Sequence, residues 1–236
     1  MKSNRRMPVY KKDFRRVSER GLSMIEVLLS LIVLSVTVVF FTRAQLDANK
    51  QLESKQTAEA MEDFTAMASD YLLSNKDGII NAMIDGTGAS SWCVINANTS
   101  TGVGTVANNT TLHTCAVDVS YLKYKKVVPA NYAELNQYKQ RWTAIYRLVY
   151  ADYANTGGAP TQEGSVEMLV VGAKNGGAET SAEASDALLA ASIAGYTGGY
   201  IPNGQWGNCK YNGTAKTACG SSGGWKVDLS QFLNTP

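Results

Sequence analysis

The chain has 236 residues, of which 44% are hydrophobic and 18% are charged, so it is long enough for one medium-sized domain or two small ones. Its net charge of +2 is unevenly distributed: residues 1–21 contain eight basic and two acidic side chains, which leaves a net charge of about −4 for residues 22–236. A weakly acidic globular part lacks the basic surface of nucleic-acid-binding proteins, so we expect no nucleic acid among the partners.

The first predicted element is an apolar run at residues 22–41, in which Glu26 is the single charge. A helix of 20 residues is roughly 30 Å long, the thickness of a bilayer core. The basic residues before it predict a cytoplasmic N-terminus, with the rest of the chain beyond the inner membrane. A cleaved secretory signal fits less well, because its apolar core is shorter and TRAQLDANKQ contains no Ala-x-Ala site. On hydropathy alone, a plain single-pass anchor explains the run equally well.

Glu26 separates these explanations. A carboxylate within a membrane helix costs a few kcal/mol, so it needs a partner or a function. Gly21 at the end of a basic segment, four residues, Glu26 and then about fifteen apolar residues resemble the type IV prepilin signature. In that family a dedicated membrane peptidase cuts after the Gly on the cytoplasmic side, and the new N-terminus is usually methylated.

The resemblance implies cleavage between Gly21 and Leu22, N-methylation of Leu22, and an apolar helix that is retained as the packed core of a filament. Glu26 would then offset the positive N-terminus of a neighbouring subunit, which gives the buried charge a partner. A leader of 21 residues, with Leu rather than Phe at position 22, resembles the type IVb branch.

Beyond the apolar run, residues 45–75 contain no Pro or Gly and are rich in helix-forming residues. Apolar residues recur there at spacings of three and four, which predicts an amphipathic helix packed on the protein's own sheet. These residues are Met61, Phe64, Ala68, Tyr71 and Leu72. We therefore expect a basic leader at 1–21, a spine helix at 22–76 whose residues 22–41 cross the membrane, and a globular domain at 77–236.

The globular domain is expected to combine strands with a short helix. Residues 87–126 are rich in Gly, Ser, Thr and Asn, which predicts loop with weak strands. Alternating residues at 141–153 and a β-rich run at 164–173 predict an antiparallel hairpin. An Ala-rich run at 179–195 predicts a helix that ends at Gly195, and 223–229 predicts a closing strand. The fold class is thus α+β, and the resemblance implies a type IV pilin fold with the long helix packed on an antiparallel sheet.

A second resemblance covers most of this domain. The hairpin, the short helix, Gly198-Gly199-Tyr200-Ile201 and Gly223-Gly224-Trp225 are similar to the N-terminal constant region of the shufflon-type conjugative pilus tip adhesin. Members of that family continue into a long variable tip that recognises lipopolysaccharide of the recipient cell, whereas this sequence stops at Pro236. The resemblance therefore implies a minor pilin more than a recognition protein.

Four cysteines fit an exported domain, because an even count in an oxidising compartment indicates disulfides. Of the three possible pairings we favour Cys93–Cys115 and Cys209–Cys219, since each pair brackets a loop rich in Gly, Asn and Thr. Their spacings, and a single histidine, His113, do not match a zinc site, so no metal is expected. Asp77, Asp85 and Asp118 form no dense calcium-binding motif either.

We expect no enzymatic activity and no cofactor. A catalytic site would have to be built around His113, which lies in a polar loop, and the glycine-containing segments lack the spacing of a phosphate-binding loop. The sequence instead predicts a minor pilin of a type IVb pilus, at or near the tip, that primes assembly or supports attachment.

The expected partners are prepilin peptidase, the major pilin, other minor pilins and the inner-membrane assembly platform. The protein would lie in the inner membrane before assembly and in the extracellular pilus afterwards. Two alternatives stay open. A type II secretion pseudopilin shares the signature and the helix but usually has a short leader. A tip adhesin could bind a cell-surface glycan through aromatic residues of the body, such as Tyr196, Tyr200, Trp206 and Tyr211.

Overall fold

The computed structural model describes residues 24–149, 164–173, 184–202, 204–206, 209–211 and 216–232. The chain divides into two compact units, Met1–Asp47 and Ala48–Pro236. The described residues of the first unit all belong to helix α1, Met24–Ser74, which also supplies the first helix of the second unit.

In the first unit, α1 exposes a continuous apolar surface. Its large apolar side chains up to Phe41 are between 44% and 82% exposed. The 51 residues of α1 include neither Gly nor Pro, so nothing in the sequence interrupts the helix. Hydroxyl groups in this part of the helix form hydrogen bonds with its own backbone: Ser30, Thr37 and Thr42 each donate to the carbonyl four residues earlier.

The second unit combines short helices with antiparallel strands. Its further helices are α2 Lys76–Ile84, α3 Ala89–Trp92, α4 Val119–Tyr124, α6 Ala184–Ile193 and the 3-10 helix η2 Leu229–Gln231. The strands are β1 Val94–Ile95, β2 Thr105–Val106, β3 Asn108–Asn109, β4 Thr114–Asp118, β5 Arg141–Val149, β6 Ser165–Ala173, β7 Gly199–Tyr200, β8 Gly204–Trp206, β9 Cys209–Tyr211, β10 Thr217–Gly220 and β11 Lys226–Asp228.

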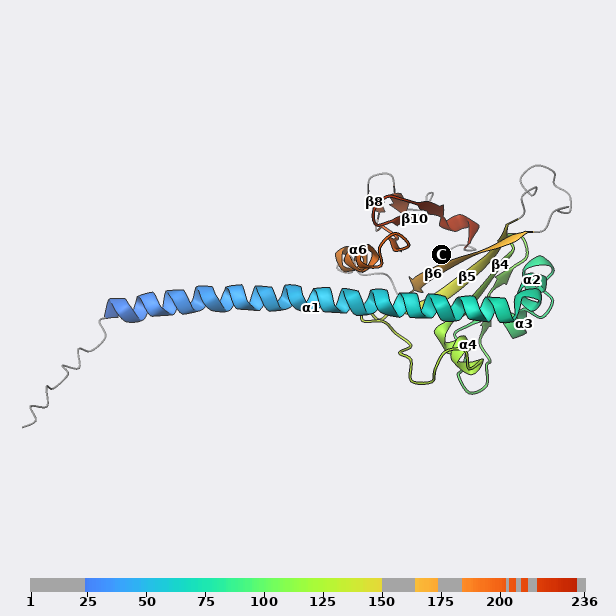
Figure 1. Ribbon diagram of the computed structural model, residues 1–236, viewed down its shortest axis with the longest axis horizontal. Helices are drawn as coiled ribbons and strands as arrows, with labels where there is room; N and C mark the ends of the chain where they lie inside the picture. Colours follow the sequence, from blue (N-terminus) through green and yellow to red (C-terminus); the bar gives the residue numbers. More distant parts are fainter. Residues whose placement is uncertain are drawn as a thin grey trace, which may run out of the picture. The chain divides into compact units, whose positions relative to one another are not determined.

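The largest sheet has the strand order β3-β4-β5-β6 (Figure 1). β5 and β6 pair antiparallel along their whole length, from Arg141 opposite Ala173 to Val149 opposite Ser165. The hairpin predicted from residues 141–153 and 164–173 is thus confirmed over its described residues. Three smaller sheets have the orders β1-β2, β11-β10-β7 and β8-β9.

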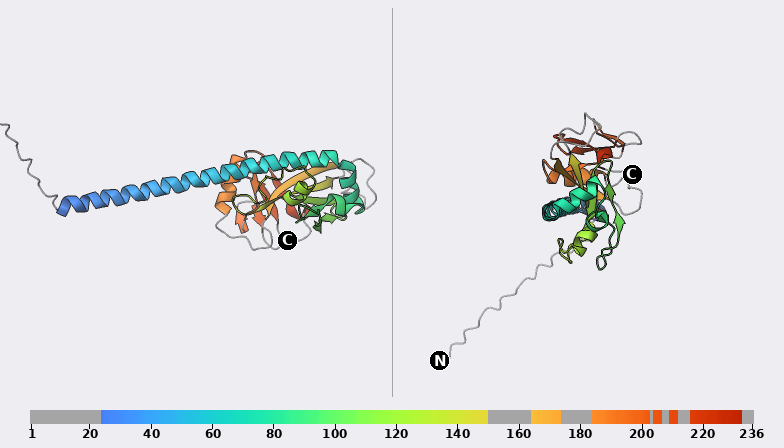
Figure 2. Two further views of the ribbon diagram at one scale, coloured as in Figure 1. Left: turned by 90° about the horizontal axis from the view of Figure 1, so that it is seen from below. Right: turned by 90° about the vertical axis from the view of Figure 1, so that its right-hand side faces the viewer.

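The core of the second unit lies between α1 and this sheet. Phe64, Ala68 and Tyr71 of α1 are at most 1% exposed and pack with Val117 of β4 and Tyr146 of β5. Figure 2 shows the second half of α1 lying along the sheet in two further views. The predicted apolar stripe is confirmed, since Met61 and Leu72 also pack against this core. Each fully buried large apolar side chain contributes about 1.5–3 kcal/mol to this packing.

One region differs from its prediction. Residues 87–126, predicted as loop with weak strands, contain the five-residue strand β4 and helix α4, and β4 lies between β3 and β5 inside the sheet. The sequence directly before β4 is rich in Asn and Thr, and β4 itself is short. Its formation as a strand therefore depends on pairing and burial in the tertiary structure more than on a local pattern.

The helix and the closing strand that the sequence predicts in the C-terminal part are both present. α6 is followed by Gly195, whose φ of +73° is the left-handed conformation of a helix C-terminus; residues 179–183 of the predicted helix lie outside the described residues. The predicted closing strand is present as β11, although it pairs with β10 in a separate sheet. The fold class is α+β, with a long N-terminal helix followed by antiparallel sheets, which is consistent with the pilin fold.

Candidate functional site

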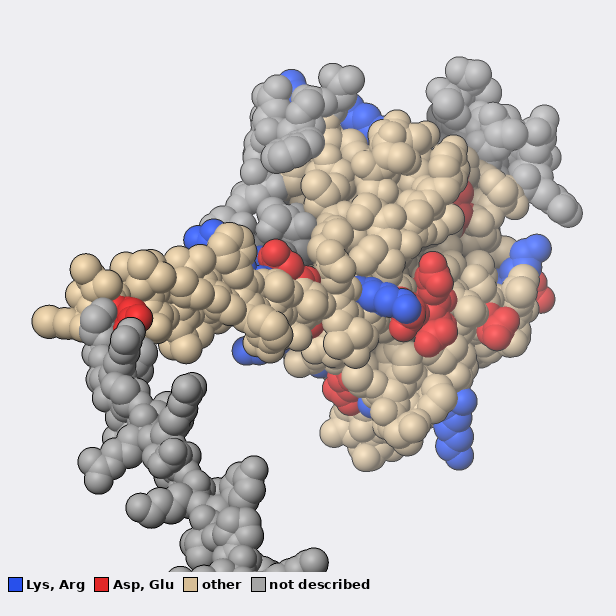
Figure 3. Space-filling view, turned by 60° about the vertical axis from the view of Figure 1, so that its left-hand side comes forward, with Lys and Arg blue, Asp and Glu red and all other residues tan. Residues whose placement is uncertain are grey.

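The exposed apolar part of α1 is the first candidate site. By length and composition, α1 contains a stretch able to cross a membrane, which is consistent with single-pass anchoring. Between Glu26 and Arg43 this helix has no charged side chain, as the tan surface in Figure 3 shows. An exposed apolar surface of this extent needs cover from lipid or from other protein chains.

Glu26 lies in the first turn of α1, where the helix dipole favours a negative charge. Its side chain is exposed, and its carbonyl accepts a hydrogen bond from Ser30 Oγ at 2.7 Å. The structure thus places the carboxylate at the start of the apolar helix. The predicted cleavage and methylation positions, Gly21 and Leu22, lie outside the described residues.

Two disulfides stabilise the second unit, and all four cysteines take part in them. Cys93, at the end of α3, is joined to Cys115 of β4 with a Cα–Cα distance of 5.1 Å, and both residues are fully buried. Cys209 of β9 is joined to Cys219 of β10 with a Cα–Cα distance of 6.1 Å. These are the pairings that the sequence favoured, and each ties a short element to a neighbouring strand.

Tyrosine hydroxyls attach α1 to the rest of the second unit. Tyr132 donates to the carbonyl of Ala60 and Tyr146 donates to the carbonyl of Ala68, both at 2.7 Å. The hydroxyl of Tyr138 lies 2.9 Å from Ser54 Oγ. These contacts supplement apolar packing with directional bonds, each worth about 1 kcal/mol net.

The same contacts affect the ionisation of the tyrosines. Burial, together with the nearby carboxylate of Asp63, raises the pKa of Tyr132 to about 12. Burial alone raises the pKa of Tyr146 well above its ordinary value. Tyr71, whose hydroxyl donates to the carbonyl of Trp92, has its pKa raised by burial and then by nearby Tyr121. The folded second unit therefore requires these three tyrosine hydroxyls to be protonated.

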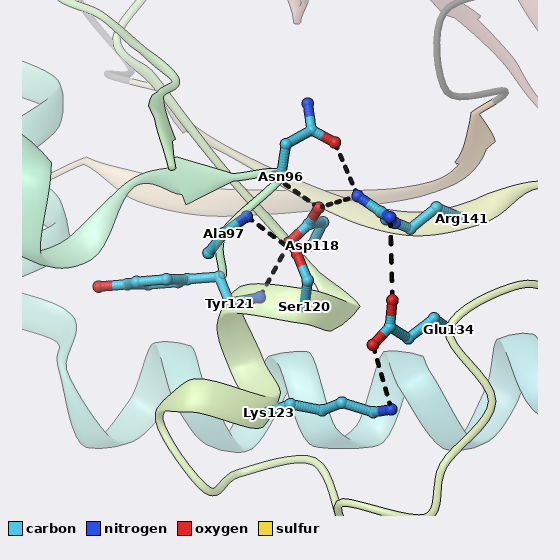
Figure 4. A network of polar contacts seen from close by, with 8 residues as sticks. All are labelled: Asn96, Ala97, Asp118, Ser120, Tyr121, Lys123, Glu134 and Arg141. Carbon is cyan, nitrogen blue, oxygen red and sulfur yellow. Dashed lines mark hydrogen bonds and ion pairs between the residues drawn. The ribbon is translucent and has the colours of Figure 1, made fainter. Parts of the chain in front are cut away.

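A buried carboxylate organises the polar centre of the second unit (Figure 4). The side chain of Asp118 is 1% exposed and caps the N-terminus of α4, where Oδ1 accepts from the amide of Tyr121 at 3.0 Å and from Ser120 Oγ at 2.6 Å. Oδ2 accepts from the amide of Asn96 at 2.7 Å. Asn96 has a φ of +53°, and this bond holds its left-handed backbone in place.

Arg141 at the start of β5 supplies the opposite charge. Its Nη1 lies 3.3 Å from Asp118 Oδ2 and donates to Asn96 Oδ1 at 2.7 Å. Its Nη2 lies 3.9 Å from Glu134, whose other oxygen lies 3.5 Å from Lys123 Nζ (Figure 4). The network therefore joins the residue after β1, the end of β4, α4, the segment between α4 and β5, and the start of β5. By sequence, Asp118 stands out only as one of three aspartates that form no calcium-binding motif; its position directly before α4 is the capping signal that could have identified it.

Two further polar candidates from the sequence, His113 and Asp85, have partners within the fold. Nδ1 of His113 lies 3.1 Å from the carbonyl of Met83. Asp85 accepts from the amide of Thr87, and this hydrogen bond lowers the pKa of the carboxyl. Within the described ranges, no group of three His, Cys, Asp or Glu side chains is placed to hold a metal ion.

A groove of about 690 Å³ lies within the second unit, bordered by α1, β6, α6 and β7. Trp142, Tyr200 and Trp225 contribute aromatic surface to it. Thr57 of α1 also lines it, and its buried Oγ1 has no hydrogen-bond partner among the described residues. Of the aromatic residues named as a possible glycan surface, Tyr200 lines the groove and Tyr196 is 74% exposed, while the side chains of Trp206 and Tyr211 are not described.

No protein-family model matches the chain, and comparison with curated proteins and with solved structures finds no match. Function is therefore inferred from the architecture of the chain. A long apolar helix that precedes a small, disulfide-bonded domain of antiparallel sheets is compatible with a pilin-like fold.

Proposed function

We propose that this protein is a minor pilin of a type IVb pilus, incorporated at or near the tip, where it primes assembly or supports attachment. The observation that carries the proposal is the first part of α1, a long exposed apolar helix with an acidic residue in its first turn. The domain that follows buries the amphipathic part of the same helix against an antiparallel sheet. This combination suits a chain that is anchored in a membrane and later packed through its helix.

The proposal gives the exposed surface two successive environments. Before assembly, lipid would cover the apolar side chains of α1, and the basic residues 1–21 would hold the N-terminus on the cytoplasmic side. After cleavage by prepilin peptidase between Gly21 and Leu22, helices of the major pilin and other minor pilins would replace the lipid. The assembly platform of the inner membrane would carry out this transfer.

Glu26 has a specific role in this scheme. Its carboxylate would pair with the methylated N-terminal amine of a neighbouring subunit, because a charge in an apolar filament core needs an opposite charge beside it. The pair would also fix the axial position of the incoming helix, since a shift of one residue would separate the two charges.

A type II secretion pseudopilin is the second candidate, because it would use the same helix and the same processing. The resemblance of the leader and of the C-terminal segments favours the pilus. An adhesin that itself binds a glycan is a third possibility, for which the exposure of Tyr196 is the relevant observation.

The test is to shear surface filaments from cells that express the chain and to identify their subunits by mass spectrometry. The proposal predicts a mature chain that begins at a methylated Leu22 and is present in low amount relative to the major pilin. A chain that begins after residue 41, or one found only in a periplasmic secretion complex, would contradict it.

A further inference from the structure

Two strand edges border the groove of the second unit. β6 is the last strand in the order β3-β4-β5-β6, and β7 is the last in the order β11-β10-β7. Among the described residues, β6 pairs only with β5, and β7 pairs only with β10. In the described part of the chain, the outward main-chain N–H and C=O groups of β6 therefore have no strand partner.

The groove reaches this edge of β6 and is not confined to one face of the sheet. Side chains alternate between the two faces of a strand, so a groove over one face would be lined by every second residue. Instead, five consecutive residues of β6, 168–172, line the groove. Three consecutive residues at β7, 199–201, line it as well. The open main-chain side of each strand is thus directed to the same space.

The other walls are mainly apolar, with small residues at Ala66 of α1 and at Ala190 and Ala191 of α6, and larger side chains at Trp142 and Trp225. Among the described lining residues there is no Lys or Arg, and Glu62 is the single charged side chain. Glu62 is exposed, so its carboxylate can reach an occupant at the mouth of the groove. The lining therefore suits an apolar occupant that carries a positive charge at one end.

We propose that this groove binds an extended segment of a partner protein, which adds to the edge of β6 as a further strand and places a basic side chain beside Glu62. Main-chain hydrogen bonds along β6 would supply affinity, and alternate apolar side chains of the segment would face the walls. The inserted strand would also reach β7 and so connect the two sheets.

The regular spacing of the main-chain groups along β6 favours an extended peptide over other ligands. Along a strand edge, donors and acceptors repeat with the period of a second strand, and only another extended chain matches several of them at once. A sugar ring would instead need converging polar side chains, which the mainly apolar walls supply poorly. All described residues that line the groove belong to the second unit, so strand addition there does not depend on the assignment to a pilus.

The first experiment selects ligands for the full-length protein in lipid nanodiscs from a phage-displayed library of random peptides about twelve residues long, enough to span one strand. We expect enriched peptides with alternating apolar residues and a Lys or Arg near one end. Synthetic copies of these peptides are then titrated by fluorescence anisotropy. Failure to enrich any such pattern would overturn the proposal.

Matched variants locate the binding. Ala66 is exposed on α1 and lines the groove, so A66W should narrow it without disturbing the core and should weaken binding about tenfold or more. Ala48 is exposed on the same helix outside the groove lining, so A48W is the control and should bind normally. Glu62→Gln should weaken binding about two- to fivefold and remove most of its salt dependence, whereas Glu53→Gln should not.

Amide hydrogen exchange tests the geometry itself. Bound peptide should slow exchange in β6 and β7 but leave β3, the opposite edge of the main sheet, unchanged. Peptides that bind equally well to A66W, or that bind without protecting β6, would show that strand addition does not occur. Occupation of the groove by a lipid molecule, detected by native mass spectrometry and competing with the peptides, would likewise overturn the proposal.

Discussion

Asp118 and Arg141 form a buried ion pair in which Oδ2 of the carboxylate lies 3.3 Å from Nη1 of the guanidinium. The side chain of Asp118 is 1% exposed and that of Arg141 is 16% exposed, so little solvent screens the pair. The same carboxylate caps α4 and holds Asn96. A single residue therefore fixes the relative positions of three segments of the second unit.

Asp118→Asn should destabilise this unit by about 3 kcal/mol, because it leaves the largely buried guanidinium of Arg141 without its nearest counter-charge and replaces one acceptor oxygen with an NH2 donor that faces other donors. Urea unfolding of a fragment that begins near residue 50 would measure the loss. Glu134→Gln is the control: Glu134 is 41% exposed, and its pairs should contribute no more than about 1 kcal/mol. Equal effects of the two substitutions would contradict the central role of Asp118.

Glu26→Val should insert into the membrane at least as well as the natural chain, because a costly charge is removed. It should still be cleaved after Gly21, yet it should enter filaments poorly, since its partner amine would lose its counter-charge. Immunoblots of sheared filaments against whole-cell fractions would show the difference. Glu53→Val serves as control, and normal incorporation of Glu26→Val would exclude the proposed assembly contact.

Loss of the two disulfides should weaken the fragment by several kcal/mol, since each closed loop contributes roughly 3 kcal/mol in the chain-entropy description. Thermal melts with and without reductant would show it, and separate Cys-to-Ala double variants would divide the effect between Cys93–Cys115 and Cys209–Cys219. A thiol count on the native, oxidised fragment should be close to zero. Four reactive thiols would disprove the disulfide framework.

Alkaline pH should unfold the second unit. The pKa of Tyr132 rises from 10.0 to about 12 on folding, and those of Tyr71 and Tyr146 rise further in the same direction. Above pH 10 the unfolded chain loses these protons while the folded chain keeps them, so stability is full below about pH 10 and falls as pH rises through the folded pKa values. Each such tyrosine should add a slope of about 1.4 kcal/mol per pH unit.

Urea unfolding at a series of pH values, with ultraviolet titration of tyrosinate, would measure this slope. Tyr132→Phe should lower this slope by about 1.4 kcal/mol per pH unit, the contribution of one proton. The variant also loses the hydrogen bond to the carbonyl of Ala60, so it should be less stable at neutral pH. A stability that does not change above pH 10 would contradict the structural assignment of these hydroxyls.

Thr57→Val should leave the fragment as stable as before or stabilise it by about 1 kcal/mol, because it replaces a buried hydroxyl that has no partner among the described residues with a methyl group of similar size. Thr65 lies on the same helix and donates to the carbonyl of Met61 at 2.7 Å. Thr65→Val removes that bond while keeping the same β-branched shape, so it should be the less stable of the two in thermal melts. The reverse order would show that Thr57 has a hydrogen-bond partner.

The parts of the fold that were predictable have local patterns. The alternation in β5, the β-rich run of β6 and the stripe of Met61, Phe64 and Tyr71 are each visible within a few residues of sequence. Within the predicted loop with weak strands, the position of β4 was not predictable, because its burial depends on pairing with β5, across more than twenty residues of intervening chain. Asp118 and Arg141 are likewise distant in sequence, and the groove is formed by elements from both ends of the second unit.

The bonds from Tyr132 and Tyr146 end on main-chain carbonyls, at Ala60 and Ala68, and not on side chains. Every residue type carries a carbonyl, so these contacts place no chemical demand on the helix beyond a side chain small enough to let the ring approach. During evolution, the solvent-exposed positions of the helix can therefore vary with the partners that the helix contacts. The two tyrosines, and small residues at positions 60 and 68, are enough to hold the helix against the rest of the second unit. An alignment of relatives should therefore show variable residues along the exposed side of this helix and four conserved positions. Two of these, 60 and 68, lie on the helix, and the other two, 132 and 146, lie in a separate part of the chain.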